Sequence, residues 1–155
     1  MTNTPLTLPL DAIFSVTNTT ALVSWIVLIL LPRALVLCKL VQVLAVGGLC
    51  VAYAVLIQLV FFSVQGGGFS SLAAVQRLFE VPEVALAGWI HYLAFDLFVG
   101  LWIAQRADAM GLSRWLQAPL LGVTFMFGPI GLMLFGLTAT ARQVWRRPSP
   151  VGTAA

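Results

Sequence analysis

Residues 40–64 read LVQVLAVGGLCVAYAVLIQLVFFSV and contain no charged side chain. As a helix, this stretch is about 37 Å long at about 1.5 Å per residue. The hydrocarbon core of a bilayer is about 30 Å thick, so the stretch is long enough to cross it with some tilt. The sequence therefore predicts a membrane-spanning helix here.

Three further apolar segments flank this one, and together they predict spans at about 11–31, 40–64, 83–105 and 116–139. Over the 155 residues, 61% are hydrophobic and only 8% are charged, whereas soluble domains carry about a quarter charged residues. Lipid is the solvent that suits such a surface. We expect an all-α, polytopic membrane protein, a four-helix transmembrane bundle forming a single domain over residues 1–155.

The charge pattern argues against nucleic acid as a partner. The net charge is +3, but the eight cationic side chains are scattered and form no basic block. With four crossings, the basic residues of the two sides are equal in number and give no orientation by the positive-inside rule. One side would hold Arg77, Arg142, Arg146 and Arg147, and the other Arg33, Lys39, Arg106 and Arg114.

Several glycine, serine and proline residues predict where the helices end, begin or bend. Gly66, Gly67 and Gly68 end the second span, and Ser71 can cap a short amphipathic helix over residues 71–80, expected to rest in the membrane interface. In the fourth span, Pro129 removes a backbone hydrogen bond and predicts a kink. In the first span, residues 15–20 form a polar cluster that either faces a neighbouring helix or lies among lipid headgroups.

The third span is the informative one, because it contains the ionisable residues His91 and Asp96. Ionisable side chains are costly in a bilayer and mark functional sites by default. Five residues place the two about 140° apart around an ideal helix, whereas Trp89, Tyr92 and Asp96 share one stripe. His91 shares its stripe with Phe95.

Two interpretations remain open for this pair. In the structural one, Asp96 pairs with an arginine or with interhelical hydroxyls, and His91 bonds a backbone carbonyl. In the functional one, both act on a ligand held by aromatic side chains of the third span, which are Trp89, Tyr92, Phe95 and Trp102. One histidine and one aspartate at this spacing do not make a metal site, and no dinucleotide or P-loop motif predicts a cofactor.

Two motifs resemble a known family. The run GWIHYLAFDLF at residues 88–98 and the run TFMFGPIG at residues 124–131 resemble the membrane family of the plant abscisic-acid-deficient-four protein, the neoxanthin-synthase-like family. The resemblance covers roughly residues 25–137. It implies a four-helix membrane protein, and the plant member is tied to the isomerisation of violaxanthin, a carotenoid epoxide, to the allene neoxanthin.

The resemblance implies a carotenoid or other polyene as ligand. Opening an epoxide to an allene needs an acid at oxygen and a base at carbon, and no redox cofactor. Asp96 and His91 are the only buried candidates for such proton transfer, which makes a cofactor-independent isomerase one expectation. The sequence has no plastid transit peptide, so we expect a bacterial-type member in the inner (cytoplasmic) membrane.

Two other classes of function compete with this one. Small residues in the second and fourth spans also suit a non-catalytic accessory or assembly subunit that packs against other membrane subunits. A homodimer that forms a groove between protomers is a further expectation. A small transporter fits less well, because the two halves show no inverted repeat.

Overall fold

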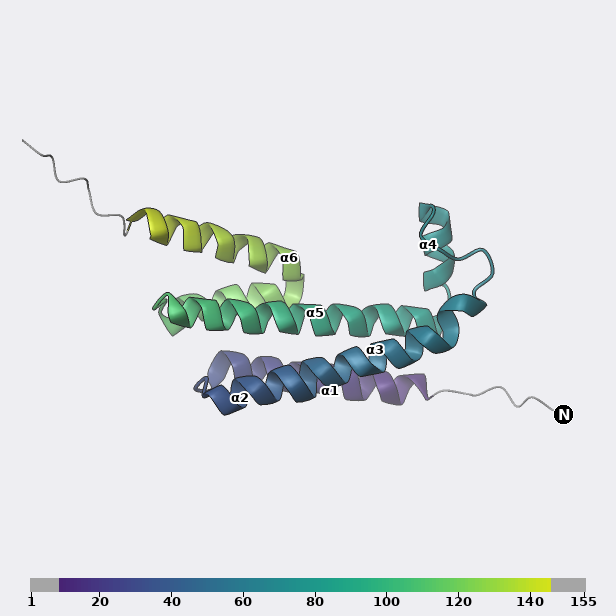
Figure 1. Cartoon of the computed structure of the whole chain (residues 1–155), viewed down its shortest axis with the longest axis horizontal. Helices are drawn as coiled ribbons and strands as arrows, with labels where there is room; N and C mark the ends of the chain where they lie inside the picture. Colours follow the sequence, from purple (N-terminus) through teal and green to yellow (C-terminus); the bar gives the residue numbers. More distant parts are fainter. Residues whose placement is uncertain (1–8, 146–155) are drawn as a thin grey trace, which may run out of the picture. The chain divides into compact units, whose positions relative to one another are not determined.

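The computed structural model describes residues 9–145, and in this range the chain forms helices and no strand (Figure 1). Helix α1 spans Leu10–Leu30. Helix α2, Leu35–Leu40, continues through a π-helical segment, η1, Val41–Val46, into α3, Gly47–Val60, and a final 3-10 turn, η2, Phe61–Ser63. Then follow α4, Leu72–Phe79, α5, Pro82–Ala109, and α6, Arg114–Trp145.

Four helical segments are long and apolar enough to cross a membrane. They are Leu10–Leu30, Leu35–Ser63, Pro82–Ala109 and Arg114–Trp145. Each contains the greater part of one predicted span, so the prediction of an all-α polytopic membrane protein is confirmed. The short helix between the second and third spans is also present. This chain is an integral membrane protein.

The chain divides into two compact units, Met1–Phe98 and Val99–Ala155. In the first, α1 contributes a buried face of small and large apolar side chains, Ala21, Trp25 and Leu28, spaced at i, i+4 and i+7. The adjoining helices contribute Leu49, Leu56 and Ile90, which are also buried. This core holds the site described below.

Helix α4 begins as the sequence predicts. The Ser71 hydroxyl accepts a hydrogen bond from the Ala74 amide at 3.2 Å, which satisfies one free donor of the first turn. Its far end packs closely on α5, where a Cβ at Gly88 would lie 2.6 Å from Cε1 of Phe79. Any larger residue at position 88 would make the Phe79 ring shift.

The π-helical turns of η1 were not predicted. Six consecutive residues, Val41–Val46, adopt this wider spiral in the middle of an otherwise α-helical span. Single π-helical turns inside α-helices occur frequently at functional sites. Residues 41–46 contain no proline or glycine, so composition gives no signal for the change of hydrogen-bond register.

In the second unit, α5 ends in a Schellman motif. Gly111 has a φ of 65°, its amide bonds the Asp108 carbonyl at 2.9 Å, and the Leu112 amide bonds the Ala107 carbonyl at 3.0 Å. Buried Gln117 then donates to Asp108 Oδ1 at 2.9 Å and to the Leu112 carbonyl at 2.7 Å. The turn from α5 into α6 is therefore tightly fixed.

Helix α6 is not straight. Phe127 and Gly128 have non-helical dihedral angles, φ −143°, ψ 40° and φ 1°, ψ −73°, just before Pro129. A Cβ at Gly131 would lie 2.5 Å from Cα and 2.6 Å from N of Thr124, so the backbones on the two sides of the break touch. The predicted kink is confirmed, and it is a reversal: α6 folds back as two arms (Figure 1).

The reversal corrects the predicted placement of Arg142. A straight helix would put Arg142 about 42 Å from Arg114 at about 1.5 Å per residue. Instead, Arg142 Nη2 donates to the Gly111 carbonyl at 2.8 Å. The expectation that Arg142 lies on the opposite side from Arg106 and Arg114 is wrong, because the second arm of α6 returns to the end of α5. Helix α6 is therefore long and apolar enough to cross a membrane, but it does not run as one straight helix. Arg146 and Arg147 lie outside the described residues.

Candidate functional site

Asp96 is a buried carboxylic acid near the middle of α5. Its side chain is only 8% exposed. The hydroxyl of Tyr92, one helical turn earlier, donates a hydrogen bond to the carboxyl group. The other oxygen, Oδ2, is buried and has no hydrogen-bond partner among the described residues. A buried oxygen without a hydrogen bond costs stability, so Oδ2 of Asp96 is a candidate for a functional role.

A line of polar and aromatic contacts leads from Asp96 to α1. Tyr92 stacks on Trp89 with ring centroids 5.4 Å apart and planes tilted by 30°. Trp89 Nε1 in turn donates to Asn18 Oδ1 at 2.9 Å. Residues Trp89, Tyr92 and Asp96 thus form the stripe that helical spacing predicts. Asn18 extends it to the first span.

The Asn18–Trp89 bond gives a testable expectation for stability. Asn18→Ala and Trp89→Phe should each lower the free energy of unfolding, and the double variant should lose less than the sum. Polar bonds between membrane helices have coupling energies of about 0.6 kcal/mol on average and about 1.7 kcal/mol at most. Reversible unfolding in mixed detergent micelles, run as a double-mutant cycle, measures the coupling. Strictly additive effects would show that the bond contributes nothing.

His91 lies in a different environment from Asp96. Its ring stacks on Phe95 with centroids 4.5 Å apart and lies 5.3 Å from the ring of Tyr53 on α3. His91 is exposed on the surface of the described chain, whereas Asp96 is buried. The structure therefore brings Asp96 together with Tyr92 and Trp89, and His91 together with Phe95 and Tyr53.

Three of the four predicted ligand-binding aromatics are exposed on the surface of the described chain. Trp89 is 43%, Phe95 57% and Trp102 47% exposed, while Tyr92 is half-buried. Trp102, in the second unit, packs edge-on against Phe135 of α6 at 5.6 Å.

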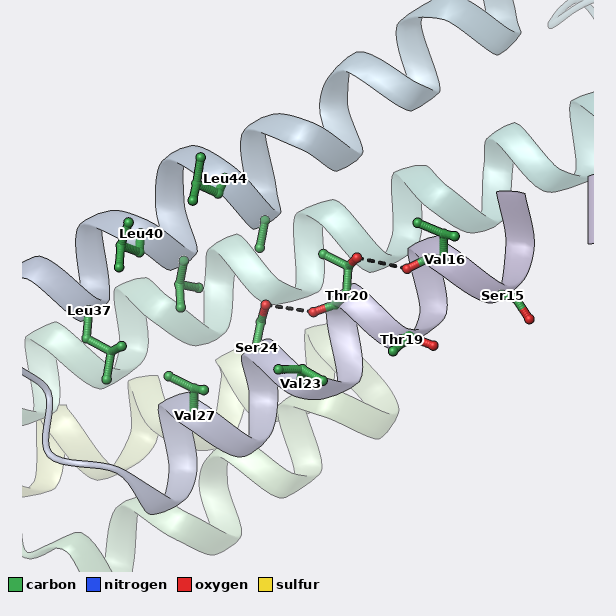
Figure 2. A pocket seen from close by; sticks show the side chains of 12 residues that line it. Ser15, Val16, Thr19, Thr20, Val23, Ser24, Val27, Leu37, Leu40 and Leu44 are labelled. Carbon is green, nitrogen blue, oxygen red and sulfur yellow. Dashed lines mark hydrogen bonds between the residues drawn. The ribbon is translucent and has the colours of Figure 1, made fainter. Parts of the chain in front are cut away.

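A groove of about 640 Å³ lies between α1 and the α2–η1 segment (Figure 2). Its volume falls in the range of small-molecule sites, about 300–1,000 Å³. Apolar side chains of both elements line it, including Val16 and Val23 from α1 and Leu37, Leu40 and Leu44 from α2 and η1. The π-helical turns contribute part of this wall, so their wider spiral shapes the groove.

Two of the four hydroxyl residues in the groove, Thr20 and Ser24, are bonded within their own helix. Thr20 donates to the Val16 carbonyl at 2.8 Å, and Ser24 donates to the Thr20 carbonyl at 2.7 Å, as the dashed lines of Figure 2 show. The protons of these two hydroxyls are used within α1. The lining residues other than the serines and threonines are valines, leucines and an alanine, so the groove suits a mainly apolar occupant. Of the polar cluster, Asn18 faces a neighbouring helix.

Among residues 9–145, no three His, Cys, Asp or Glu side chains lie close enough together to hold a metal ion. Comparison with protein families gives a match over residues 12–135 to the family described as ABA DEFICIENT 4-like. The chain belongs to the ABA DEFICIENT 4-like family. A search of curated proteins and a search of solved structures each found no match.

The ABA DEFICIENT 4-like match includes every residue of the site. It begins in α1 and ends in the second arm of α6, so it covers Asn18, the groove, His91 and Asp96. It starts earlier than the resemblance over residues 25–137 expected from the sequence. Asn18 and Tyr53 were missed as site residues. The polar cluster signalled Asn18, but nothing in the sequence identifies its partner, 71 positions away.

Proposed function

We propose that this ABA DEFICIENT 4-like protein binds a carotenoid of the epoxide-xanthophyll type and isomerises it. The observation that carries the proposal is the buried Asp96 carboxyl, bonded to Tyr92 through one side while its Oδ2 has no partner among the described residues. Ionisable groups within membrane-spanning segments mark ligand or proton pathways by default.

Epoxide-to-allene isomerisation suits such a site. A proton is delivered to the epoxide oxygen as its C–O bond breaks, and another proton leaves a carbon of the chain to complete the allene. The two transfers leave the composition of the substrate unchanged. Asp96, positioned by Tyr92, carries one transfer, and its unpaired oxygen is the atom that exchanges the proton. His91 carries the other, acting on the same ligand from the Phe95 side of α5.

The surroundings support an apolar, elongated ligand. Trp89, Phe95 and Trp102 are exposed and offer flat faces to a polyene. The groove between α1 and α2–η1 is mainly apolar, since eight of its twelve lining residues are valine, leucine or alanine, and Thr20 and Ser24 are bonded inside α1. Aromatic and aliphatic walls with few polar groups are typical of sites for apolar small molecules.

Pigment analysis tests the binding part of this proposal. The full chain, purified in mild detergent from its native membrane, should carry a polyene in fixed ratio, visible by absorption and identified in an organic extract. Tyr92→Phe keeps the ring but removes the hydroxyl and should shift the absorption band or lower occupancy. The control Phe62→Leu removes an exposed aromatic outside the site and should leave both unchanged.

A colourless protein that takes up no added xanthophyll would contradict the proposal. If that protein also purified with other polypeptides at constant ratio, the accessory-subunit function would take its place. The large lipid-facing area of α1 and of the Leu35–Ser63 segment, each 28% buried, would then be the contact surface.

A further inference from the structure

A second cavity lies in the other unit, where α5 ends and the second arm of α6 returns. It has a volume of about 280 Å³ and is lined by Arg106, Ala109, Met110, Arg142 and Gln143. Two of these five residues carry a positive charge and none carries a negative one. The lining of the cavity is therefore cationic at Arg106 and Arg142 and apolar at Ala109 and Met110.

Arg142 is held in place by one hydrogen bond, but one of its other donors has no partner among the described residues. Its Nη2 donates to the Gly111 carbonyl at 2.8 Å, and the Schellman turn fixes that carbonyl. Its Nε is buried and has no hydrogen-bond partner among the described residues. A guanidinium has five N–H donors in a rigid fork that matches the oxygens of phosphate. A buried, unpaired donor in this fork is suited to an anionic oxygen.

The neighbouring acidic residue, Asp108, does not neutralise the cavity. Asp108 lies on the same last turns of α5, but one oxygen of its carboxylate accepts from Gln117, and it does not line the cavity. Arg106 and Arg142 therefore both line the cavity as positive charges, and Gln143 lines it beside them. Like charges that line one cavity repel each other, and an anion between them relieves that repulsion.

We propose that this cavity binds a phosphate group, that of an anionic phospholipid headgroup. Arg106, Arg114 and Arg142 gather at this end of the second unit, whereas residues 120–135 around the reversal contain no lysine or arginine. With Arg142 on the same side as Arg106 and Arg114, the basic residues of the two sides are no longer equal in number, and the positive-inside rule favours the cytoplasm for this end. The cytoplasmic leaflet is rich in anionic lipids, and basic pockets between membrane helices bind their headgroups.

Lipid titration tests the site. The full-length protein in detergent is titrated with phosphatidylglycerol, phosphatidylcholine or inorganic phosphate, and the bound species are counted by native mass spectrometry. Phosphatidylglycerol should bind more tightly than phosphatidylcholine. Arg106→Gln and Arg142→Gln should each weaken its binding at least about tenfold, since hydrogen bonds to charged groups are worth about 1.5–3 kcal/mol. The control Arg77→Gln removes an arginine from α4 and should change nothing.

The outcomes separate the possible sources of the phosphate. Inorganic phosphate that binds with the same dependence on Arg106 and Arg142 would support the phosphate site but overturn the lipid as its source. Phosphatidylglycerol binding that neither variant weakens, or that equals phosphatidylcholine binding, would overturn the site. Arg106→Gln leaves the Arg142–Gly111 bond in place, so the test stands even if Arg142→Gln does not fold.

Discussion

Asp96→Asn is expected to lower the rate of xanthophyll conversion by about 10²- to 10⁴-fold, the usual contribution of a general acid or base. Asparagine keeps the size of the side chain and can still accept a hydrogen bond from Tyr92. It cannot give up or take a proton in the required range. The measurement is conversion of violaxanthin by the protein in proteoliposomes, followed by chromatography of the extracted pigment.

Two further variants make this result specific. Asp11→Asn removes an exposed carboxylate from the first turn of α1 and should leave the rate unchanged, which controls for loss of charge alone. His91→Ala tests the second proton transfer and should also slow conversion. If Asp96→Asn and His91→Ala both converted the substrate at the full rate while folded, neither residue would be catalytic. Loss of activity in Asp96→Asn alone would assign the chemistry to Asp96 and Tyr92.

Local features of this fold could be predicted because each depends on a few neighbouring residues. The absence of charge over 40–64 predicts a lipid-embedded helix, and Ser71 after three glycines predicts a new helix start. Helical periodicity likewise places Trp89, Tyr92 and Asp96 on one stripe, whatever the helix packs against. The stacking of Trp89 on Tyr92 and the Tyr92–Asp96 hydrogen bond follow from that stripe.

Features that depend on distant residues could not be predicted. Asn18 bonds a tryptophan 71 positions later, and the polar cluster offered several residues equally able to do so. The same limit applies to His91, whose neighbour Tyr53 belongs to another helix. Spacing alone places His91 and Asp96 about 140° apart, but it does not identify what fills the space around each.

Helix α6 shows where a local signal was present but incomplete. Pro129 predicts a break, because proline lacks an amide donor, and the neighbouring Gly128 tolerates the unusual dihedral angles found there. They do not fix the angle of the break. The approach of Gly131 to Thr124 and the bond from Arg142 to Gly111 fix it, and both join residues on opposite sides of the break. The phosphate cavity depends on this reversal and therefore could not be predicted from the sequence.

Gly131→Ala should strongly destabilise the second unit. Its Cβ would lie 2.5 Å from Cα and 2.6 Å from N of Thr124, and backbone atoms cannot move aside as a side chain can. Overpacking typically costs about 1–3 kcal/mol, and we expect a loss of about 3 kcal/mol or more in unfolding free energy. Gly136→Ala is the matched control, because nothing lies within 4 Å of its Cβ. It should be neutral or stabilising by up to about 1 kcal/mol.

A distance across α6 decides whether the reversal causes this difference. Spin labels on cysteines at Ser113 and Gln143, both exposed, report the separation of the two ends after Cys38 and Cys50 are replaced by alanine. A straight helix would separate those positions by about 45 Å at about 1.5 Å per residue. The Arg142–Gly111 bond requires a far shorter distance. Gly131→Ala should shift the distribution towards the long distance, while Gly136→Ala should preserve the short one. A long distance in the unmodified sequence would remove the basis of both the reversal and the phosphate cavity.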